Sequence, residues 1–446
     1  MKKLFSKFNT AQLLFISFLL VIGVGTVLLL LPVSTNHAIA FIDALFTSTT
    51  ATCVTGLMTL TAGEDFTLFG QVVILLLIQV GGLGLMSFVT LIMNIGSENM
   101  GLKERMFIKD SLNKDNFENV RQYLFTIFRY TFVIEIVGFV ILLTQFYDGT
   151  AYSVFKTLFL AISAFCNAGI DLFGSNSLIP YQTNSVVNIT VCLLIILGGL
   201  GFVVLLDIKK NLSLKLDGNI YTFSKLKIHS KLVIHMTIIL IVSGMLLIFG
   251  FEYNNALDGF SFLEKLEISL FNSVTLRTAG FATFDYSLLL RPTKIIMLIY
   301  MLVGASPGGT GGGMKTTTFF LLIYSVYTQY RNEEHMNIYK HHIHKNNLVK
   351  ATSIFAVYLS FLIISMIILT SVESGDSLNL LFEAVSAIGT VGLTTGITTE
   401  LCTISKLVII VLMIIGRVGP ITVAILFGSK SNNKLIKFPK TDIIVG

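Results

Sequence analysis

The sequence predicts an all-α integral membrane protein built from four copies of one helical unit. Of its 446 residues, 54% are hydrophobic and 13% are charged, whereas an average soluble domain has about 25% charged residues. The apolar residues form runs long enough to cross a bilayer, and a glycine-containing segment recurs at nearly constant spacing. These observations exclude an ordinary soluble protein, and the elements that they predict are justified below in order.

Eight apolar stretches are candidate membrane spans, because about 20 apolar residues in a helix cross a bilayer core about 30 Å thick. Seven are continuous and one is apolar at both ends but interrupted in its middle; they cover residues 11–32, 71–94, 124–146, 186–206, 231–251, 293–327 (the interrupted one), 350–371 and 405–428. The first stretch is preceded by lysines and followed by Ala38-Ile39-Ala40, so a cleaved signal peptide is an alternative. Its apolar run of about 20 residues exceeds the 7–15 of a signal peptide, which favours a span.

The basic residues predict the orientation of these spans, since cytoplasmic loops carry an excess of Lys and Arg. Of 31 such residues, 22 lie in the two tails and in the segments 96–121, 207–231 and 329–350. We therefore expect a multi-pass plasma-membrane protein with both termini in the cytoplasm. The basic excess needs no nucleic-acid partner, and the four widely spaced cysteines suggest neither a disulfide framework nor a zinc site.

A segment with a small-and-hydroxyl run followed by a glycine occurs four times. The copies are Phe46–Leu57, Phe159–Ile170, Phe271–Phe281 and Phe382–Leu393, and their glycines are 113, 111 and 112 residues apart. Each copy lies between two apolar spans and is too short in apolar residues to cross the membrane, which is typical of re-entrant segments. The predicted repeats are residues 1–100, 101–215, 216–335 and 336–446, each a span, a pore helix, a loop and a second span.

Four re-entrant loops predict one pseudo-fourfold pore, because non-helical backbone at membrane depth must be buried in protein or line a cavity. Glycine tolerates positive φ and so lets backbone carbonyls point inward; a ring of carbonyls can replace the hydration shell of K⁺. The pore helices also direct their negative C-terminal ends at the cavity. The candidate ion ligands are Val54, Thr55 and Gly56; Asn167, Ala168 and Gly169; Thr278, Ala279 and Gly280; and Thr390, Val391 and Gly392.

Alternatives to this interpretation remain for single segments. Each glycine alone would more often be a helix-packing contact, but four glycines in register favour the filter. No carboxylate directly precedes any of the four glycines, which is unlike a filter for divalent cations.

The interruption in residues 293–327 predicts an intramembrane gate. Six of the ten residues from 304 to 313 are glycine, and Pro307 removes a backbone donor, so this stretch cannot stay helical in lipid. The gate residues that we predict are Gly304, Gly308, Gly309, Gly311, Gly312, Gly313 and Lys315, with the whole loop at 304–315. A passive kink is the alternative. The likeness to a phosphate-binding loop fails at Met314, and the likeness to a nucleophile elbow fails at Pro307, so we expect no enzyme.

Arg417 lies in the middle of the last span and is the other predicted gate residue. A charge at this depth costs about 2.5–3.5 kcal/mol on insertion scales and marks function. We expect Arg417 to bond carbonyls of the 304–315 loop and hold it shut; a structural clamp away from the ion path is the alternative. Arg129 and Glu135 receive no role, and His335, His341, His342 and His344 are expected in a solvated or partner-facing loop rather than a metal site.

The four filter loops and the glycine-rich loop resemble those of the Trk/Ktr/HKT superfamily of potassium transporters, closest to the Ktr-type membrane subunit. The resemblance covers about residues 10–430 and implies K⁺ uptake with a glycine in every filter segment. Gly56 argues against sodium permeation, which a serine in the first segment would bring into play. The resemblance also implies a homodimer on a cytosolic ring of nucleotide-binding regulatory subunits, with K⁺ as the transported ion and no organic cofactor.

Two other classes of function remain to be weighed. An alternating-access carrier for another solute also uses repeats and broken helices, but the repeats here are parallel and each has a re-entrant loop. A membrane scaffold without transport leaves the four glycines unexplained. Channel-like flux and sodium-coupled symport both remain open.

Overall fold

The computed structural model describes residues 10–84, 120–216, 225–333, 335–419 and 422–423, and most of these are helical. The helices are α2 (Thr10–Leu29), α3 (Phe41–Cys53), α4 (Leu68–Gly82), α7 (Val120–Phe146), α8 (Ala151–Cys166), α9 (Ser185–Leu200), α10 (Phe202–Leu216), α11 (Ile228–Glu252), α12 (Phe262–Thr275), α13 (Arg291–Leu302), α14 (Thr316–Tyr330), α15 (Lys345–Val372), α16 (Ser377–Gly389) and α17 (Thr403–Val418). Short 3₁₀ turns are η1 (Ile179–Tyr181), η3 (Tyr286–Leu288) and η4 (Ile397–Glu400); strands β1 (Asn337–Ile338) and β2 (His341–His342) form one hairpin. The predicted all-α class is confirmed.

In the part of the chain that the structure describes, four helices are long and apolar enough to cross a membrane. They contain the stretches Gln12–Leu29, Leu124–Phe146, Ile228–Glu252 and Lys345–Val372, and the bent pair α9–α10 would make a fifth span. The four long helices are the first spans of the four predicted repeats. Many of their apolar side chains face outward, such as Leu20 (62% exposed) and Ile367 (65% exposed), as lipid contact requires.

Four short helices, α3, α8, α12 and α16, follow these long helices and correspond to the predicted pore helices. Their starts are fixed by local chemistry: the Thr150, Ser261 and Asp376 side chains each accept a hydrogen bond from a backbone N–H of the first turn. Their last turns are buried among other helices. Each therefore directs its C-terminal end into the interior of the protein.

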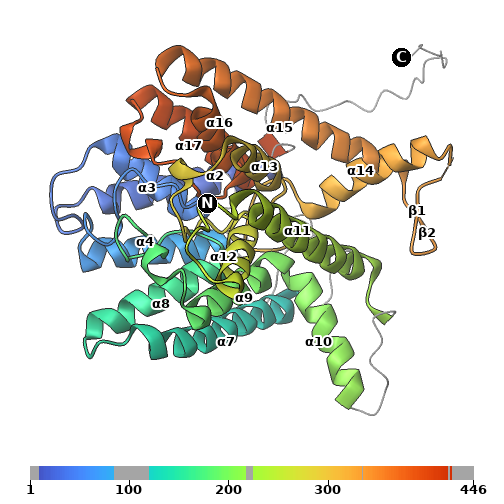
Figure 1. The fold of residues 1–446 in the computed structure, drawn as a ribbon, viewed down its shortest axis with the longest axis horizontal. Helices are drawn as coiled ribbons and strands as arrows, with labels where there is room; N and C mark the ends of the chain where they lie inside the picture. The colour runs from blue at the N-terminus through green and yellow to red at the C-terminus, as the bar shows by residue number, and fades with distance from the viewer. Residues whose placement is uncertain (1–9, 85–119, 217–224, 334, 420–421, 424–446) are drawn as a thin grey trace, which may run out of the picture.

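The repeats close into a ring around this interior. The helix that follows each pore helix packs against the pore helix of the next repeat: α4 against α8, α9 against α12, α13 against α16, and α17 against α3. Figure 1 shows the four groups of helices arranged around the centre, from blue α2–α4 to red α16–α17. The last contact joins the two ends of the chain and completes the ring. The predicted repeat boundaries themselves stay a prediction.

The predicted second spans are less continuous than we expected. The stretch 186–206 is broken after Leu200, where α9 and α10 meet at 100°. Helix α4 ends at Gly82 and α17 at Val418, inside the predicted spans 71–94 and 405–428. Thr422 and Val423 are helical again, and the other residues beyond Gly84 and Gly419 in these two spans lie outside the described residues. Gly84, Gly201 and Gly419 follow these ends with φ of 82°, 94° and 92°, a conformation that costs side-chain-bearing residues about 1–2 kcal/mol.

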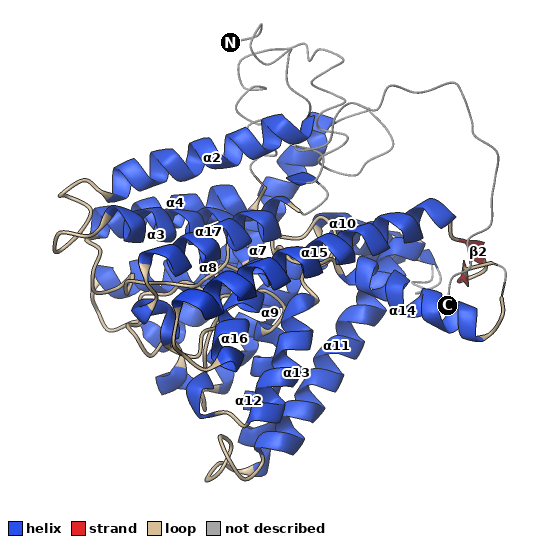
Figure 2. Ribbon diagram, turned by 90° about the horizontal axis from the view of Figure 1, so that it is seen from above, coloured by secondary structure: helices blue, strands red, loops and turns tan. Residues whose placement is uncertain are grey.

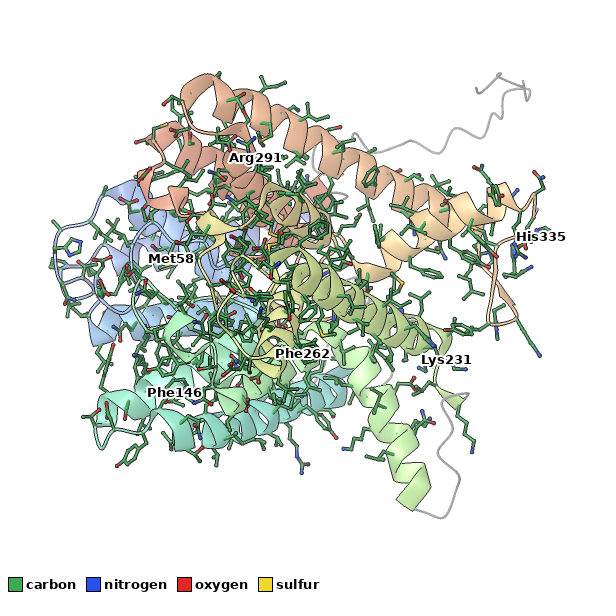
Figure 3. The ribbon with its side chains drawn as sticks, viewed as in Figure 1. Met58, Phe146, Lys231, Phe262, Arg291 and His335 are labelled. Atoms are coloured by element: carbon green, nitrogen blue, oxygen red, sulfur yellow. The ribbon has the colours of Figure 1, made fainter. Side chains whose placement is uncertain are left out.

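A projecting arm carries the basic and histidine-rich segment that we predicted to be cytoplasmic. Figures 1 and 2 show α14, the start of α15 and the β1–β2 hairpin extending from one side of the helical body, and Figure 3 places His335 there, far from Met58. The His335 and His342 rings lie 5.1 Å apart. No group of three or more potential metal ligands occurs among the described residues. Much of the 96–121 segment, the first nine residues and most of the C-terminal tail lie outside the described ranges.

Candidate functional site

The four candidate filter loops share one backbone conformation. The first residue of each loop is left-handed, with φ of 56° at Val54, 60° at Asn167, 64° at Thr278 and 51° at Thr390. The glycine two residues later is also left-handed, with φ of 101° at Gly56, 64° at Gly169, 79° at Gly280 and 95° at Gly392. The left-handed conformation carries little steric cost at the second position, because glycine has no Cβ.

The four glycines lie next to one another in a ring. A Cβ built on Gly56 would lie 3.1 Å from the Cα atoms of both Gly169 and Gly392, and one on Gly280 would lie 3.0 and 3.2 Å from those same two atoms. It would also meet the backbone oxygen of the neighbouring loop in every case: Ala168 from Gly56, Ala279 from Gly169, Val391 from Gly280 and Thr55 from Gly392. The structure thus brings together all four predicted segments, and no side chain fits at the ring.

Hydroxyl groups in the pore helices hold the loops in place, a feature to which the sequence analysis gave no role. Thr50 Oγ1 accepts from the Gly56 N–H at 3.0 Å, and Ser386 Oγ accepts from the Gly392 N–H at 3.1 Å. Ser163 Oγ accepts from the N–H of Ile170, and Thr275 Oγ1 donates to the Phe281 carbonyl. Thr50, Ser163 and Ser386 stand six residues before the loop glycine, and Thr275 stands five before it in the third repeat. This regular spacing could have identified them.

Glu383 supports the outer side of the fourth loop and was also missed. It is 1% exposed, and its carboxylate accepts from the hydroxyls of Thr394 and Thr398 and from the Thr395 N–H. Asn272 has the corresponding place in the third repeat, directly after the phenylalanine that opens the segment, and it bonds Thr283 and Tyr286. The first two repeats have Thr47 and Leu160 at this position, so the polar support is confined to one half of the ring.

We expect Glu383→Ala to lower both thermal stability and the preference for K⁺ over Na⁺. Hydrogen bonds to a charged group contribute about 1.5–3 kcal/mol each, and the substitution removes three of them. The measurement is thermal unfolding in detergent together with the ratio of K⁺ to Na⁺ uptake into proteoliposomes. Glu400→Ala, at an exposed position after the same loop, is the matched control and should change neither. Wild-type values in Glu383→Ala would contradict the supporting role.

The predicted gate loop lies directly against the filter loops. A Cβ on Gly311 would overlap the Thr278 hydroxyl, and the Gly312 N–H donates to Thr390 Oγ1 at 3.1 Å. The Thr310 hydroxyl donates to the Phe165 carbonyl at 3.0 Å. The loop therefore contacts the second, third and fourth filter segments. Gly304, Gly308, Gly309 and Gly313 also belong to it, and a Cβ on Gly304, Gly309 or Gly313 would lie within 3 Å of neighbouring backbone.

Backbone hydrogen bonds tie this loop to the neighbouring helices. The Ser306 and Thr310 N–H groups donate to the Gly199 and Gly198 carbonyls at 3.0 and 3.1 Å, and the Gly313 N–H donates to the Gly416 carbonyl at 3.2 Å. Lys315, at the start of α14, donates to the Gly311 carbonyl at 2.8 Å. The loop is thus bonded on one side to the break in α9 and on the other to the end of α17.

Arg417 reaches both the gate loop and the first repeat. Its guanidinium donates to the Thr310 carbonyl, to the Gly81 carbonyl and, at 3.4 Å, to the Gly82 carbonyl. No carboxylate of the described residues forms an ion pair with it. Arg417 thus contacts a carbonyl of the 304–315 loop, and its role as a gate residue stays a prediction; its bond to α4 was not foreseen. A cavity of about 160 Å³ lies beside this contact and is lined by Lys315, Tyr358 and Arg417 among others.

Comparisons with known proteins agree with this arrangement. The family model described as "TrkH: Cation transport protein" matches residues 2–435. The chain is 39% identical to "Ktr system potassium uptake protein B" of Bacillus subtilis over 99% of this chain and 97% of that protein. It is 35% identical to "Potassium/sodium uptake protein NtpJ" of Enterococcus hirae, over 100% and 99% of the two chains.

A solved structure shares the fold. The potassium transporter TrkH from Vibrio parahaemolyticus superposes with a TM-score of 0.73 at 17% sequence identity, over 94% of this chain and 85% of that one. The family is one of transporters, so the expectation that the chain is not an enzyme is confirmed, as is the resemblance seen in the sequence. This chain belongs to the TrkH family of cation transport proteins and is a multi-pass membrane protein.

Proposed function

We propose that the chain takes up K⁺ across the plasma membrane through a selectivity filter made of backbone carbonyls from the four loops. The observation that carries the proposal is the ring of Gly56, Gly169, Gly280 and Gly392, each in contact with the backbone of its neighbours. A ring of carbonyls without carboxylates replaces the hydration shell of a monovalent cation. The names of the relatives, which refer to potassium uptake, support the choice of ion.

The finer architecture belongs to the same proposal. We propose eight transmembrane spans and four re-entrant pore helices, with the second spans formed by α4, α9–α10, α13–α14 and α17 and their continuations. The long helices α2, α7, α11 and α15 and the four short buried helices support it. We also propose that both termini are cytoplasmic, which the basic loops support under the positive-inside rule.

The 304–315 loop is proposed as the gate. It is bonded to the filter residue Thr390 and held by Arg417, so its displacement would open the path below the ring. The cavity of about 160 Å³ beside Lys315 and Arg417 offers space next to the loop for such a movement. A passive kink would need none of these bonds to Arg417.

An alternating-access carrier is the second candidate function. Its support is the broken second spans, which are typical of carriers, and the 100° bend between α9 and α10 adds another break. The fourfold ring favours the pore, since a carrier site needs no such closure. The Enterococcus relative's name includes sodium, and sodium dependence is therefore part of the test.

A homodimer on a cytosolic ring of nucleotide-binding regulatory subunits completes the proposal. The words "Ktr system" in three relatives' names are consistent with a separate component. The projecting arm of α14 and the β1–β2 hairpin, with exposed Lys340, His341 and His342, offers a surface for it. Loss of partner binding when Lys340, His341 and His342 are replaced together by Ala would support this contact.

The decisive experiment is uptake of Rb⁺ or K⁺ into proteoliposomes that contain this chain, alone and with the cytosolic component. We expect uptake driven by membrane potential, with K⁺ preferred over Na⁺, and we would vary external Na⁺ to detect coupling. Exchange that requires solute on both sides, without net potential-driven flux, would favour the carrier. No cation flux under any condition would refute the proposed function.

A further inference from the structure

An acidic side chain, Glu135, lies inside the proposed membrane-spanning region and forms no ion pair with any described residue. Glu135 is near the middle of α7 and is 2% exposed. The ion pairs among the described residues are His37–Asp65 and Lys406–Asp43, so Glu135 has none. An ionisable group at this depth is costly and is a functional-site hypothesis by default. The filter and the gate described above make no use of it.

The only polar side chain bonded to Glu135 in the described residues connects it to the second filter loop. Gln79 of α4 places Nε2 3.2 Å from each carboxylate oxygen of Glu135. The Cys166 thiol donates to the Oε1 of the same amide, with Sγ and Oε1 3.5 Å apart. Cys166 is fully buried and directly precedes Asn167, the first residue of that loop. The three side chains thus form a chain from α7 through α4 to the filter.

The same turn of α4 is bonded to the gate. Arg417 donates to the carbonyls of Gly81 and Gly82, two and three residues after Gln79. A Cβ on Gly82 would lie 2.6 Å from Cys166 Sγ, so the thiol packs directly on this backbone. A change at Gln79 is therefore adjacent to both the second filter loop and the Arg417 anchor.

We propose that Glu135 is an intramembrane proton-binding site whose occupancy controls cation flux through the orientation of the Gln79 amide. The observed arrangement, in which Nε2 faces both carboxylate oxygens, suits ionised Glu135. A proton on one oxygen of Glu135 turns that oxygen from an acceptor into a donor, which favours an amide turned so that Oε1 accepts from it, because an amide presents its donor and its acceptor on opposite sides. Cys166 loses its acceptor in that state. Since the bound species is a proton exchanged with water, no other reactant is required.

Other titratable groups around Glu135 are few. Helix α8 brings Cys166, and α9, which packs along α7, has Cys192 as its single titratable residue. Helix α17 brings Arg417 to the neighbouring carbonyls, while Lys209 of α10 lies over the Tyr130 ring, with 4.6 Å between Nζ and the ring centroid. None of these is bonded to the Glu135 carboxylate, so its proton is sensed through Gln79.

The test rests on the proposed cation uptake and includes one readout that does not. We would measure K⁺ uptake into proteoliposomes over a series of pH values for wild type, Glu135→Gln, Gln79→Leu and, as a matched control, Glu333→Gln at an exposed position. In parallel, infrared difference spectra would follow the C=O stretch of a protonated carboxyl group. We expect wild-type and Glu333→Gln uptake to fall severalfold as the pH falls, and Glu135→Gln uptake to be independent of pH.

Gln79→Leu separates proton binding from its effect. We expect its uptake to be independent of pH while the Glu135 infrared band still titrates, and we expect that band to be missing in Glu135→Gln. A wild-type pH profile in Glu135→Gln, or an infrared titration unchanged by that substitution, would overturn the inference. Wild-type uptake without pH dependence would overturn the inference and leave the proposed function intact. If no cation flux is found, the infrared titration still tests whether Glu135 binds a proton.

Discussion

Replacing Gly392 by serine should abolish most of the preference for K⁺ over Na⁺, by about tenfold or more, which corresponds to about 1.4 kcal/mol. Gly392 has φ of 95°, and a Cβ there would overlap the carbonyl oxygen of Thr55 and lie 2.8 Å from the Gly56 Cα. The new side chain therefore displaces a ligand of the first loop as well as distorting the fourth. Uptake of K⁺ and Na⁺ from mixtures of known composition measures the ratio.

A neighbouring glycine provides the control for backbone strain. Gly396 has φ of 97°, but nothing lies within 4 Å of a Cβ built on it. Gly396→Ser carries the same left-handed penalty, roughly 1–2 kcal/mol, without entering the ring. It should lower thermal stability and keep the K⁺ preference. Equal loss of selectivity in both variants would show that strain in the outer loop, rather than contact within the ring, is responsible.

The fourfold organisation could be predicted from sequence because the loop of each repeat has the same conformational requirement. A loop at membrane depth needs a residue with positive φ, and the glycines that meet this need recur at intervals of 111–113 residues. The hydroxyl residues that support the loops also recur at regular spacing, but Ser and Thr in a short helix can form many other hydrogen bonds. Only the hydrogen bonds of Thr50, Ser163 and Ser386 show which of them hold the loops.

The breaks in the second spans were missed although a pattern for them exists. Gly81-Gly-Leu-Gly84, Gly198-Gly-Leu-Gly201 and Gly416-Arg-Val-Gly419 share a glycine at each end. A Cβ on the first glycine of each would overlap a carbonyl of its own repeat's pore helix, from Thr52, Phe165 or Ile388. Hydropathy cannot reveal this, because glycine and leucine keep the average apolar. In the third repeat the corresponding segment is Gly304-Ala-Ser-Pro307, with proline in place of the last glycine. The glycine run that follows it makes this correspondence hard to see in the sequence.

Aligning these four-residue segments of the repeats explains the position of Arg417. It occupies the position of Gly82 and Gly199 in the first two repeats, where a Cβ would lie 2.6 Å from Cys166 Sγ and 3.4 Å from Asn167 Nδ2, respectively. Sequence alone predicted a gate contact but left open whether the side chain faces the ion path. The bonds to Thr310 on one side and to Gly81 on the other require both repeats to be in place, which no local pattern specifies.

Replacing Arg417 by alanine should raise cation flux, by tenfold or more at saturating ion concentration and without any cytosolic component. The substitution removes charged hydrogen bonds to Thr310 and Gly81, each with a contribution of about 1.5–3 kcal/mol. Loss of both would shift a closed–open equilibrium of the loop by about 3 kcal/mol, or roughly 100-fold. The bonds of Gly312 and Gly313 to Thr390 and Gly416 remain and limit the increase. Initial uptake rates into proteoliposomes measure the effect.

Arg417→Lys tests whether the two-sided contact matters. A lysine ammonium is a point charge and cannot bond Thr310 and Gly81 in the way that a planar guanidinium does, so its flux should be intermediate. Arg331→Ala, at an exposed position on the projecting arm, is the control for loss of one positive charge and should behave as wild type. Folding of each variant is checked by size-exclusion chromatography and thermal unfolding. Unchanged flux in a folded Arg417→Ala would refute the gate contact. A folded variant that no longer conducts would instead identify Arg417 as a clamp that keeps the pore assembled, because its bonds join the first repeat to the third.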